Sequence, residues 1–303
     1  MISIYPTIYH EFQCKADQCE NTCCQLWTID IDEPTAERYH SMTGSLGESL
    51  RQAITVDDEG SHFIFSKTQP MCPLLNEKGL CKVVLELGEE GLCDTCHMHP
   101  RFYKYIEDLE LCGVGLSCEA SVELLARQEP MDLLLFTIED DHNEFNSEER
   151  LTLQNVFELL AFDLDPNLFQ YTPNSKDQSF KELLALYKRT EPIDENWTAQ
   201  VNTLSNKLDQ LIASVQTYIQ QEDMSLFNKV YQYILYRQID MLSDYSLESI
   251  LAYAKDGTDY ILIASALEGQ PLKQIARWSQ QIEYDEDNVA LLLQHYEAQL
   301  IIE

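Results

Sequence analysis

The sequence predicts a mainly α-helical protein, in which an irregular, cysteine-rich N-terminal part with short strands precedes an α-helical C-terminal part. Two observations support this prediction. All ten cysteines and eight of the ten glycines lie within the first 118 residues, and from about Ser121 onward apolar residues recur at helical spacing. Since 303 residues suffice for two ordinary domains, we expect a cysteine-rich domain over residues 1–120 and a helical domain over residues 121–303.

The N-terminal part contains two short runs with the alternating pattern of strands, at residues 27–32 and 62–65. Asp32 is expected to cap a helix that has Pro34 in its first turn. Because a segment so interrupted by glycine and proline buries little apolar surface, we expect a metal–thiolate centre to contribute the missing stability.

Helices account for the C-terminal part. A helix is expected from Ser147 through Leu160, with acidic residues in its first turn, where the helix dipole favours them. The acidic stretch from Glu139 to Glu144 is interpreted as a solvated linker. In residues 226–235 the apolar residues keep the three-four spacing of an amphipathic helix. Further helices are expected at residues 180–187, 197–218, 226–242, 247–254, 272–282 and 289–302.

The charge balance excludes some partners. The chain has 52 Asp and Glu against 20 Lys and Arg, a formal net charge of -32, whereas nucleic-acid binding depends on clustered positive charge. The acidity suits a partner that carries lysines or arginines, or it simply keeps the chain soluble. No signal peptide is recognised at the N-terminus and no apolar run is long enough for a membrane helix. We therefore expect a cytoplasmic protein with reduced thiols.

The cysteines follow the spacing Cys14-x4-Cys19-x3-Cys23-Cys24, Cys72-x8-Cys81 and Cys93-x2-Cys96, with Cys112 and Cys118 beyond. A Cys-x2-Cys pair holds two thiolates at the separation that one metal site requires, and soft thiolates select zinc or iron–sulfur clusters. The spacing leaves iron and zinc open. His97 and His99, just after Cys96, are interpreted as hydrogen-bonded neighbours of the metal loop and not as ligands.

Several enzyme classes are excluded because their motifs are absent from the sequence. Cys24 follows Cys23 directly, so the Cys-x3-Cys-x2-Cys motif of radical initiators is missing. The chain also lacks a glycine-rich dinucleotide loop, a phosphate loop of the Gly-x4-Gly-Lys type and a Gly-x-Ser-x-Gly nucleophile elbow.

The cysteine pattern resembles that of the flagellin lysine-N-methylases, a group with a zinc- or iron-chelating cysteine domain. The resemblance covers about the first 125 residues. It depends on paired Cys23-Cys24 followed by Trp27, on Cys72-Pro73, and on the Leu-Ser-Cys sequence that ends at Cys118. It implies transfer of a methyl group from S-adenosylmethionine to lysine ε-amines of flagellin or another protein, and an iron–sulfur cluster, of the 4Fe-4S type, with zinc as the alternative.

The resemblance also implies which cysteines bind the metal. Cys112 is off the pattern and is interpreted as an ordinary buried thiol. Catalytic and donor-binding residues are not identified, because the acidic and tyrosine side chains that could accept the lysine proton are too many to choose among. Nine cysteines match the pattern: Cys14, Cys19, Cys23, Cys24, Cys72, Cys81, Cys93, Cys96 and Cys118.

Two other functions compete with methyl transfer. The chain could be a non-catalytic module that uses zinc or iron to fold and interacts through its helices. Alternatively, it could be a metal chaperone or redox sensor, whose exposed thiolates would release metal under mild oxidation.

Overall fold

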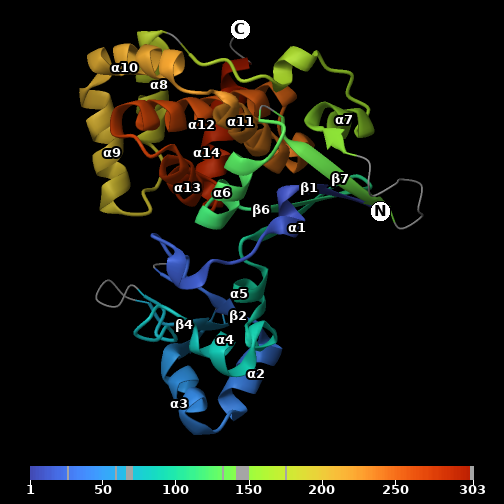
Figure 1. Cartoon of the computed structure of the whole chain (residues 1–303), viewed down its shortest axis with the longest axis vertical. Coiled ribbons are helices and arrows are strands. Elements are labelled where there is room, and N and C mark those ends of the chain that lie inside the picture. Colours follow the sequence, from blue (N-terminus) through green and yellow to red (C-terminus); the bar gives the residue numbers. More distant parts are fainter. Residues whose placement is uncertain are drawn as a thin grey trace. The chain divides into compact units, whose positions relative to one another are not determined.

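The computed structural model describes residues 1–25, 27–58, 60–65, 71–131, 133–140, 150–174 and 176–300. The chain forms two compact units (Figure 1). The cysteine unit is Gln13–Pro100, and the sheet–helix unit combines Met1–Phe12 with Arg101–Glu303. The protein is mainly helical, as predicted, and all the cysteines and most of the described strands lie in its N-terminal part. Two strands lie beyond residue 130, in the part expected to be helical.

The cysteine unit contains a small three-stranded sheet, in which β4 (Gly60–Phe63) lies between β2 (Asp30–Ile31) and β3 (Ile54–Asp57). The strands predicted at residues 27–32 and 62–65 are therefore present but differ in extent. The helices of this unit are α2 (Glu33–Ser41), α3 (Gly44–Ala53), α4 (Lys82–Leu87) and α5 (Asp94–Met98), with 3-10 turns η1 (Ala16–Gln18) and η2 (Glu89–Gly91).

The predicted cap at Asp32 is confirmed. Its carboxylate accepts a hydrogen bond from the Thr35 backbone amide at 2.9 Å, and Pro34 lies in the first turn of α2. The second carboxylate oxygen accepts from the Asp94 amide, also at 2.9 Å. One side chain thus holds the starts of α2 and α5 together, and α5 carries Cys96.

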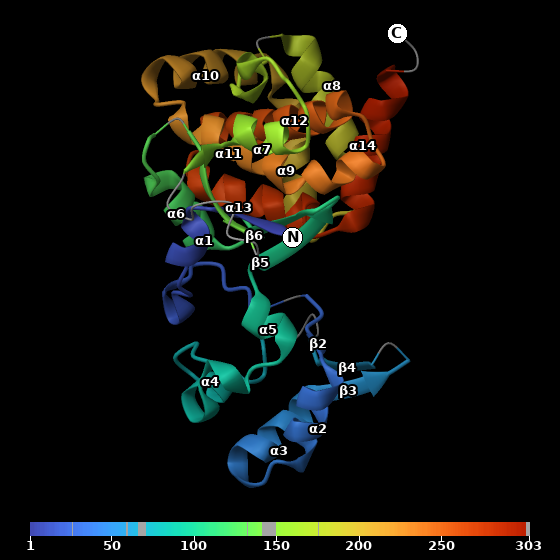
Figure 2. The ribbon, with the colours of Figure 1, turned by 90° about the vertical axis from the view of Figure 1, so that its right-hand side faces the viewer.

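The sheet–helix unit contains a five-stranded sheet of order β5-β6-β1-β7-β8. Its central strand β1 (Ile2–Pro6) is parallel to β6 (Leu109–Val114) and antiparallel to β7 (Leu135–Asp140). The edges are β5 (Arg101–Ile106) and β8 (Leu151–Thr152). Figures 1 and 2 show the helices on one side of this sheet. The Tyr236 hydroxyl reaches the backbone oxygens of Ile4 and Cys112 at 2.9 and 2.7 Å, which joins the sheet to the helical core.

The helices of this unit share one apolar core, and no described helix is long and apolar enough to cross a membrane. They are α1 (Ile8–Glu11), α6 (Glu119–Arg127), α7 (Leu153–Leu159), α8 (Asp177–Tyr187), α9 (Glu195–Asn206), α10 (Leu208–Gln221), α11 (Ser225–Arg237), α12 (Leu247–Glu268), α13 (Pro271–Ile282) and α14 (Glu286–Leu300), with 3-10 turns η3 (Pro166–Phe169) and η4 (Ile239–Ser243).

Two local predictions are wrong, and a third is contradicted at the two of its residues that the structure describes. The linker predicted at residues 139–144 begins as the last two residues of β7, and its remainder lies outside the described residues. The helix predicted from Ser147 starts only at Leu153, because residues 151–152 pair with β7 as a strand. The helix predicted over residues 197–218 is two helices, since the backbone leaves helical geometry at Lys207.

In helix α12 Asp259 is buried and Asp256 is half-buried, and we predict that Asp256 makes stability depend on pH. Burial, followed by the charge of Asp259, raises the pKa of the Asp256 carboxyl to about 6, although it accepts a hydrogen bond from the Tyr296 hydroxyl at 2.8 Å. Folding then takes up a proton between about pH 4 and pH 6, so this group costs stability as pH rises through that range.

Asp256→Asn should therefore stabilise the protein at pH 8, by about 2 kcal/mol at most, since the carboxyl is only partly buried. The gain should be smaller by about 1 kcal/mol at pH 5, where most of the native carboxyl is protonated. Urea unfolding at both pH values measures the difference. Asp209→Asn, at an exposed position, controls for the loss of one negative charge, and an equal gain at pH 5 and pH 8 would contradict the prediction.

Candidate metal centre

Five of the nine predicted cysteines meet in the core of the cysteine unit. Cys72 and Cys93 are buried there with Tyr39 and Phe63, and Cys24, Cys81 and Cys96 pack against the same cluster. The Cys72 backbone amide donates a hydrogen bond to the Cys24 oxygen at 2.9 Å. We call these five residues the thiol cluster.

Short helices position most of these thiols. Cys93 is the cap residue before α5 and Cys96 lies within α5, so the Cys-x2-Cys spacing places both sulfurs on one turn. Cys81 is the cap residue before α4, and it forms a β-bridge with Leu75, which closes the loop that follows Cys72. Residues far apart in the sequence are thereby brought to one core.

The thiols of the cluster influence one another electrostatically. A hydrogen bond from Cys23 lowers the pKa of Cys24 to about 7. Burial raises the pKa of Cys72 to about 12, with added repulsion from Cys24, Cys81 and Cys93. A hydrogen bond from Cys96 lowers the pKa of the Cys93 thiol and raises that of Cys96 itself. These interactions show sulfurs in one shared environment.

Trp27 supports this arrangement, which explains its place in the motif. Its indole N–H donates to the backbone oxygen of Cys23, and its ring lies 5.4 Å from that of His99. His97 is exposed on α5.

The other predicted ligands lie elsewhere. Cys14 is exposed and accepts a hydrogen bond from the Ala16 amide at 3.4 Å, and Cys19 is half-buried. Cys118 belongs to the sheet–helix unit, where it precedes α6. Cys23 adjoins the thiol cluster through Cys24. The proposed ligand role of all nine stays a prediction.

The thiol cluster fits a thiolate-bound metal in its chemistry, since all five donors are soft sulfurs in contact with one core. As they stand, no three or more Cys, His, Asp or Glu side chains within the described parts of the chain are arranged to hold one metal ion. The thiols would therefore have to turn toward a common centre in order to bind it.

Cys112 is fully buried in β6, in agreement with its interpretation as an ordinary thiol. Burial, followed by the nearby Glu110 charge, raises its pKa to about 12. Only the thiolate is nucleophilic, so this buried thiol is expected to be unreactive at pH 8.

We predict that iodoacetamide at pH 8 modifies exposed Cys14 in the native protein and leaves Cys112 unmodified. Peptide-level mass spectrometry gives the extent of alkylation at each cysteine. Labelling in urea is the control, because unfolding should make both thiols react equally. Alkylation of native Cys112 at the rate of Cys14 would contradict its burial.

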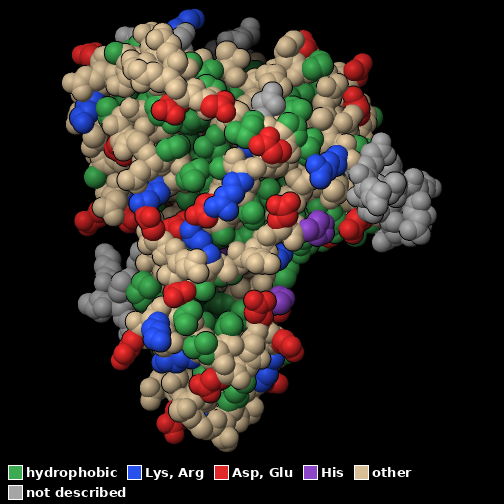
Figure 3. All heavy atoms as spheres, viewed as in Figure 1, with side chains coloured by type: hydrophobic (Ala, Val, Ile, Leu, Met, Phe, Trp, Pro, Cys, Tyr) green, Lys and Arg blue, Asp and Glu red, His purple; other side chains and the backbone are tan. Residues whose placement is uncertain are grey.

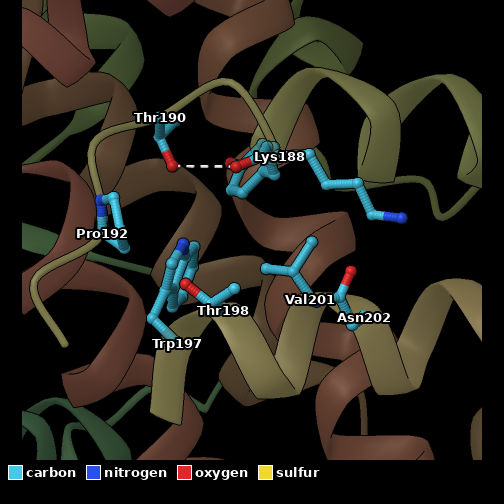
Figure 4. A pocket seen from close by; sticks show the side chains of 8 residues that line it. Lys188, Thr190, Pro192, Trp197, Thr198, Val201 and Asn202 are labelled. Atoms are coloured by element: carbon cyan, nitrogen blue, oxygen red, sulfur yellow. Dashed lines mark hydrogen bonds between the residues drawn. The ribbon is translucent and has the colours of Figure 1, made fainter. Parts of the chain in front are cut away.

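A separate cavity of about 360 Å³ lies in the sheet–helix unit. Figure 4 shows Trp197, Val201 and Asn202 of α9 opposite Thr190 and Pro192 of the preceding loop. The buried indole N–H of Trp197 has no hydrogen-bond acceptor among the described residues. Its lining is Tyr187, Lys188, Thr190, Pro192, Trp197, Thr198, Val201 and Asn202.

Known proteins resemble part of this chain. The lysine-N-methylases of Salmonella typhimurium and Salmonella choleraesuis are each 27% identical to it over 139 residues, which are 44% of this chain and 35% of each relative. The flagellar biosynthetic protein FliU of Salmonella muenchen is 27% identical over 118 residues, 37% of this chain and 70% of FliU. The match thus spans about a third of the length of the lysine-N-methylases.

No family model and no solved structure matches the chain. The resemblance predicted from the cysteine spacing is nevertheless confirmed by these relatives, and the chain is a distant homologue of the lysine-N-methylases and of FliU.

Proposed function

We propose that this chain is a cytoplasmic protein-lysine N-methyltransferase, which transfers the methyl group of S-adenosylmethionine to lysine ε-amines of flagellin or another protein. The similarity to the lysine-N-methylases carries the proposal. Five cysteines of the pattern lie in or against one core, with Trp27 packed beside them, and this arrangement supports the proposal.

The transfer makes modest demands on the protein. The lysine ammonium loses its proton to a carboxylate or water, and the amine nitrogen attacks the sulfonium methyl in line. A carbon–nitrogen bond forms as the carbon–sulfur bond breaks, and S-adenosylhomocysteine leaves with the electron pair. Catalysis therefore consists of binding and desolvating the lysine and aligning it with the donor.

We further propose that the thiol cluster holds an iron–sulfur cluster, with zinc as the alternative. Four thiolates are the usual ligand number for a cubane iron–sulfur cluster. The thiol cluster offers five cysteines, with Cys23 beside them. Bound metal would tie Cys24, the loop from Cys72 to Cys81 and helix α5 to one centre. Anaerobic purification with elemental analysis and visible absorbance would distinguish iron from zinc.

The decisive experiment incubates anaerobically purified protein with methyl-labelled S-adenosylmethionine and flagellin. Label on lysine, located by mass spectrometry of flagellin peptides, is the expected result. Heat-denatured protein is the control for chemical methylation. If neither flagellin nor another lysine-rich protein acquires label from metal-loaded enzyme, the proposal is wrong.

A non-catalytic metal module is the second candidate function, and one observation favours it. Two of the thiols, Cys72 and Cys93, are part of the buried core of the cysteine unit, which is where a metal that only stabilises a fold would be expected. Calorimetric titration with S-adenosylmethionine separates the two functions, because such a module would bind metal and show no heat of donor binding.

The surface charge agrees with a lysine-bearing partner. Figure 3 shows Asp and Glu side chains scattered over the displayed face instead of gathered in one patch. A general negative potential would attract a basic substrate, but it would not select a binding position, which must come from a more local arrangement.

A further inference from the structure

One face of the five-stranded sheet is turned away from the helical core and carries tyrosine and glutamate side chains. In the strand register, Ser3 of the central strand β1 lies opposite Glu110 of β6 on one side and Glu139 of β7 on the other. Glu110 in turn lies opposite Tyr105 of the edge strand β5. Because side chains alternate along a strand, these residues share a face. The next row on that face contains Tyr103, Cys112, Tyr5 and Thr137.

Hydrogen bonds hold the carboxylate at the centre of this face. The Ser3 hydroxyl donates to one oxygen of Glu110 at 2.6 Å, and the Tyr105 hydroxyl donates to the other at 3.0 Å. Glu110 is therefore oriented in advance, and it has lone pairs left for a further donor. Glu139 is exposed two strands away, and Tyr105 is 59% exposed, so a partner can reach both.

Aromatic rings gather beside the carboxylates. Helix α1 brings Tyr9 and His10 next to Tyr5, with ring centroids 4.9 and 5.0 Å from that of Tyr5. The Tyr9 and Tyr103 hydroxyls are hydrogen-bonded. The Arg101 guanidinium already lies over the Tyr9 ring, 5.5 Å from its centre, so this ring accepts a cation on its face.

The charge on this face suits a cation. Burial raises the pKa of the Tyr5 and Tyr9 phenols, and the hydrogen bond to Glu110 raises the pKa of Tyr105. The tyrosines are therefore neutral at pH 7 and present their rings, while Glu110 and Glu139 supply negative charge. Electron-rich ring faces combined with carboxylates attract ammonium groups.

We propose that this tyrosine–glutamate face, formed by Tyr5, Tyr9, Tyr103, Tyr105, Glu110 and Glu139, binds the side-chain ammonium of a lysine on a partner protein. If the proposed methyl transfer is correct, the bound lysine is the substrate lysine; the binding itself does not depend on that function. Charge complementarity and accessible rings favour a lysine segment over an apolar partner, since the exposed positions are polar or aromatic.

The test measures binding of a short fluorescent peptide with a single lysine to the full chain by anisotropy, without S-adenosylmethionine. The wild-type protein should bind the lysine peptide, and Nε-acetylation of that lysine should abolish binding because it removes the charge. Tyr105→Ala and Glu139→Gln should each weaken binding about threefold to tenfold. Both positions are exposed, so these variants should fold.

Two variants serve as controls. Tyr105→Phe keeps the ring and should retain most of the affinity that Tyr105→Ala loses. Glu248→Gln removes an exposed glutamate on α12 and should bind the peptide like the wild type. Equal binding of the lysine and acetyl-lysine peptides, or equal loss in Glu248→Gln and Glu139→Gln, would overturn the assignment.

The two proposals fail in different ways. If wild-type protein methylates flagellin and the face variants bind the peptide and methylate at wild-type rates, the lysine site lies elsewhere and the methyltransferase function stands. If the peptide binds as expected and no protein is methylated, the face is a lysine-binding surface and the proposed function is wrong.

Discussion

If the thiol cluster holds the proposed metal, replacing Cys72 and Cys93 together with serine is expected to remove it and to unfold the cysteine unit. Both thiols are buried in its core, at 9% and 0% exposure, and Cys93 is hydrogen-bonded to Cys96 of the thiol cluster. Metal–thiolate binding contributes on the order of 10 kcal/mol to small metal domains, more than the small apolar core of this unit is expected to supply alone. Elemental analysis and circular dichroism measure the two losses.

Matched variants separate metal loss from a packing defect. Cys112→Ala removes a buried thiol outside the cluster and should keep the metal content of the wild type. A chelator should destabilise the wild type and Cys112→Ala, and it should have no further effect on the double variant. Full metal content in the double variant would show that the ligands are other cysteines.

Removing either partner of the Arg237–Glu283 ion pair is expected to cost about 3–5 kcal/mol of unfolding free energy. The two side chains are 8% and 0% exposed, and the Arg237 Nε lies 3.4 Å from a Glu283 carboxylate oxygen. The guanidinium also lies between the rings of Phe102 and Tyr284, at 4.7 and 5.0 Å. Either single substitution leaves an uncompensated charge in a dry environment.

The double variant makes this prediction specific. Arg237→Met and Glu283→Leu should each destabilise the sheet–helix unit strongly, while the two together should cost clearly less than the sum, because an apolar pair can fill the same space. Urea unfolding followed by tryptophan fluorescence gives the coupling energy. Additive effects would mean that the two charges do not stabilise each other.

Much of the fold follows from local sequence. Asp32 with Pro34 specifies the start of α2, because a cap needs only neighbouring residues. The segment 272–282 was predicted almost to its ends, since apolar periodicity and Pro271 coincide there. The break between α9 and α10 was missed because apolar spacing continues across Lys207, and periodicity does not report a local change of backbone angles.

The strands of the large sheet were harder to predict. Ser3 and Glu110 are 107 positions apart and become neighbours only through parallel pairing of β1 with β6. Residues 101–106 contain three aromatic residues and a β-branched one, a composition typical of strands, which was the available signal for β5. Pairing partners and register depend on the whole core, so no local pattern specifies them.

The candidate sites divide in the same way. The sequence alone was enough to identify the cysteine-rich part and its relatives. The cysteines are confined to the first 118 residues, and their spacing and Trp27 can be read directly along the chain. Only the folded arrangement shows that five of the nine cysteines form one cluster. It alone also shows that four tyrosines and two glutamates share one face. Sixteen tyrosines and 52 acidic residues are equivalent in the sequence, and they differ only in which long-range contacts place them side by side.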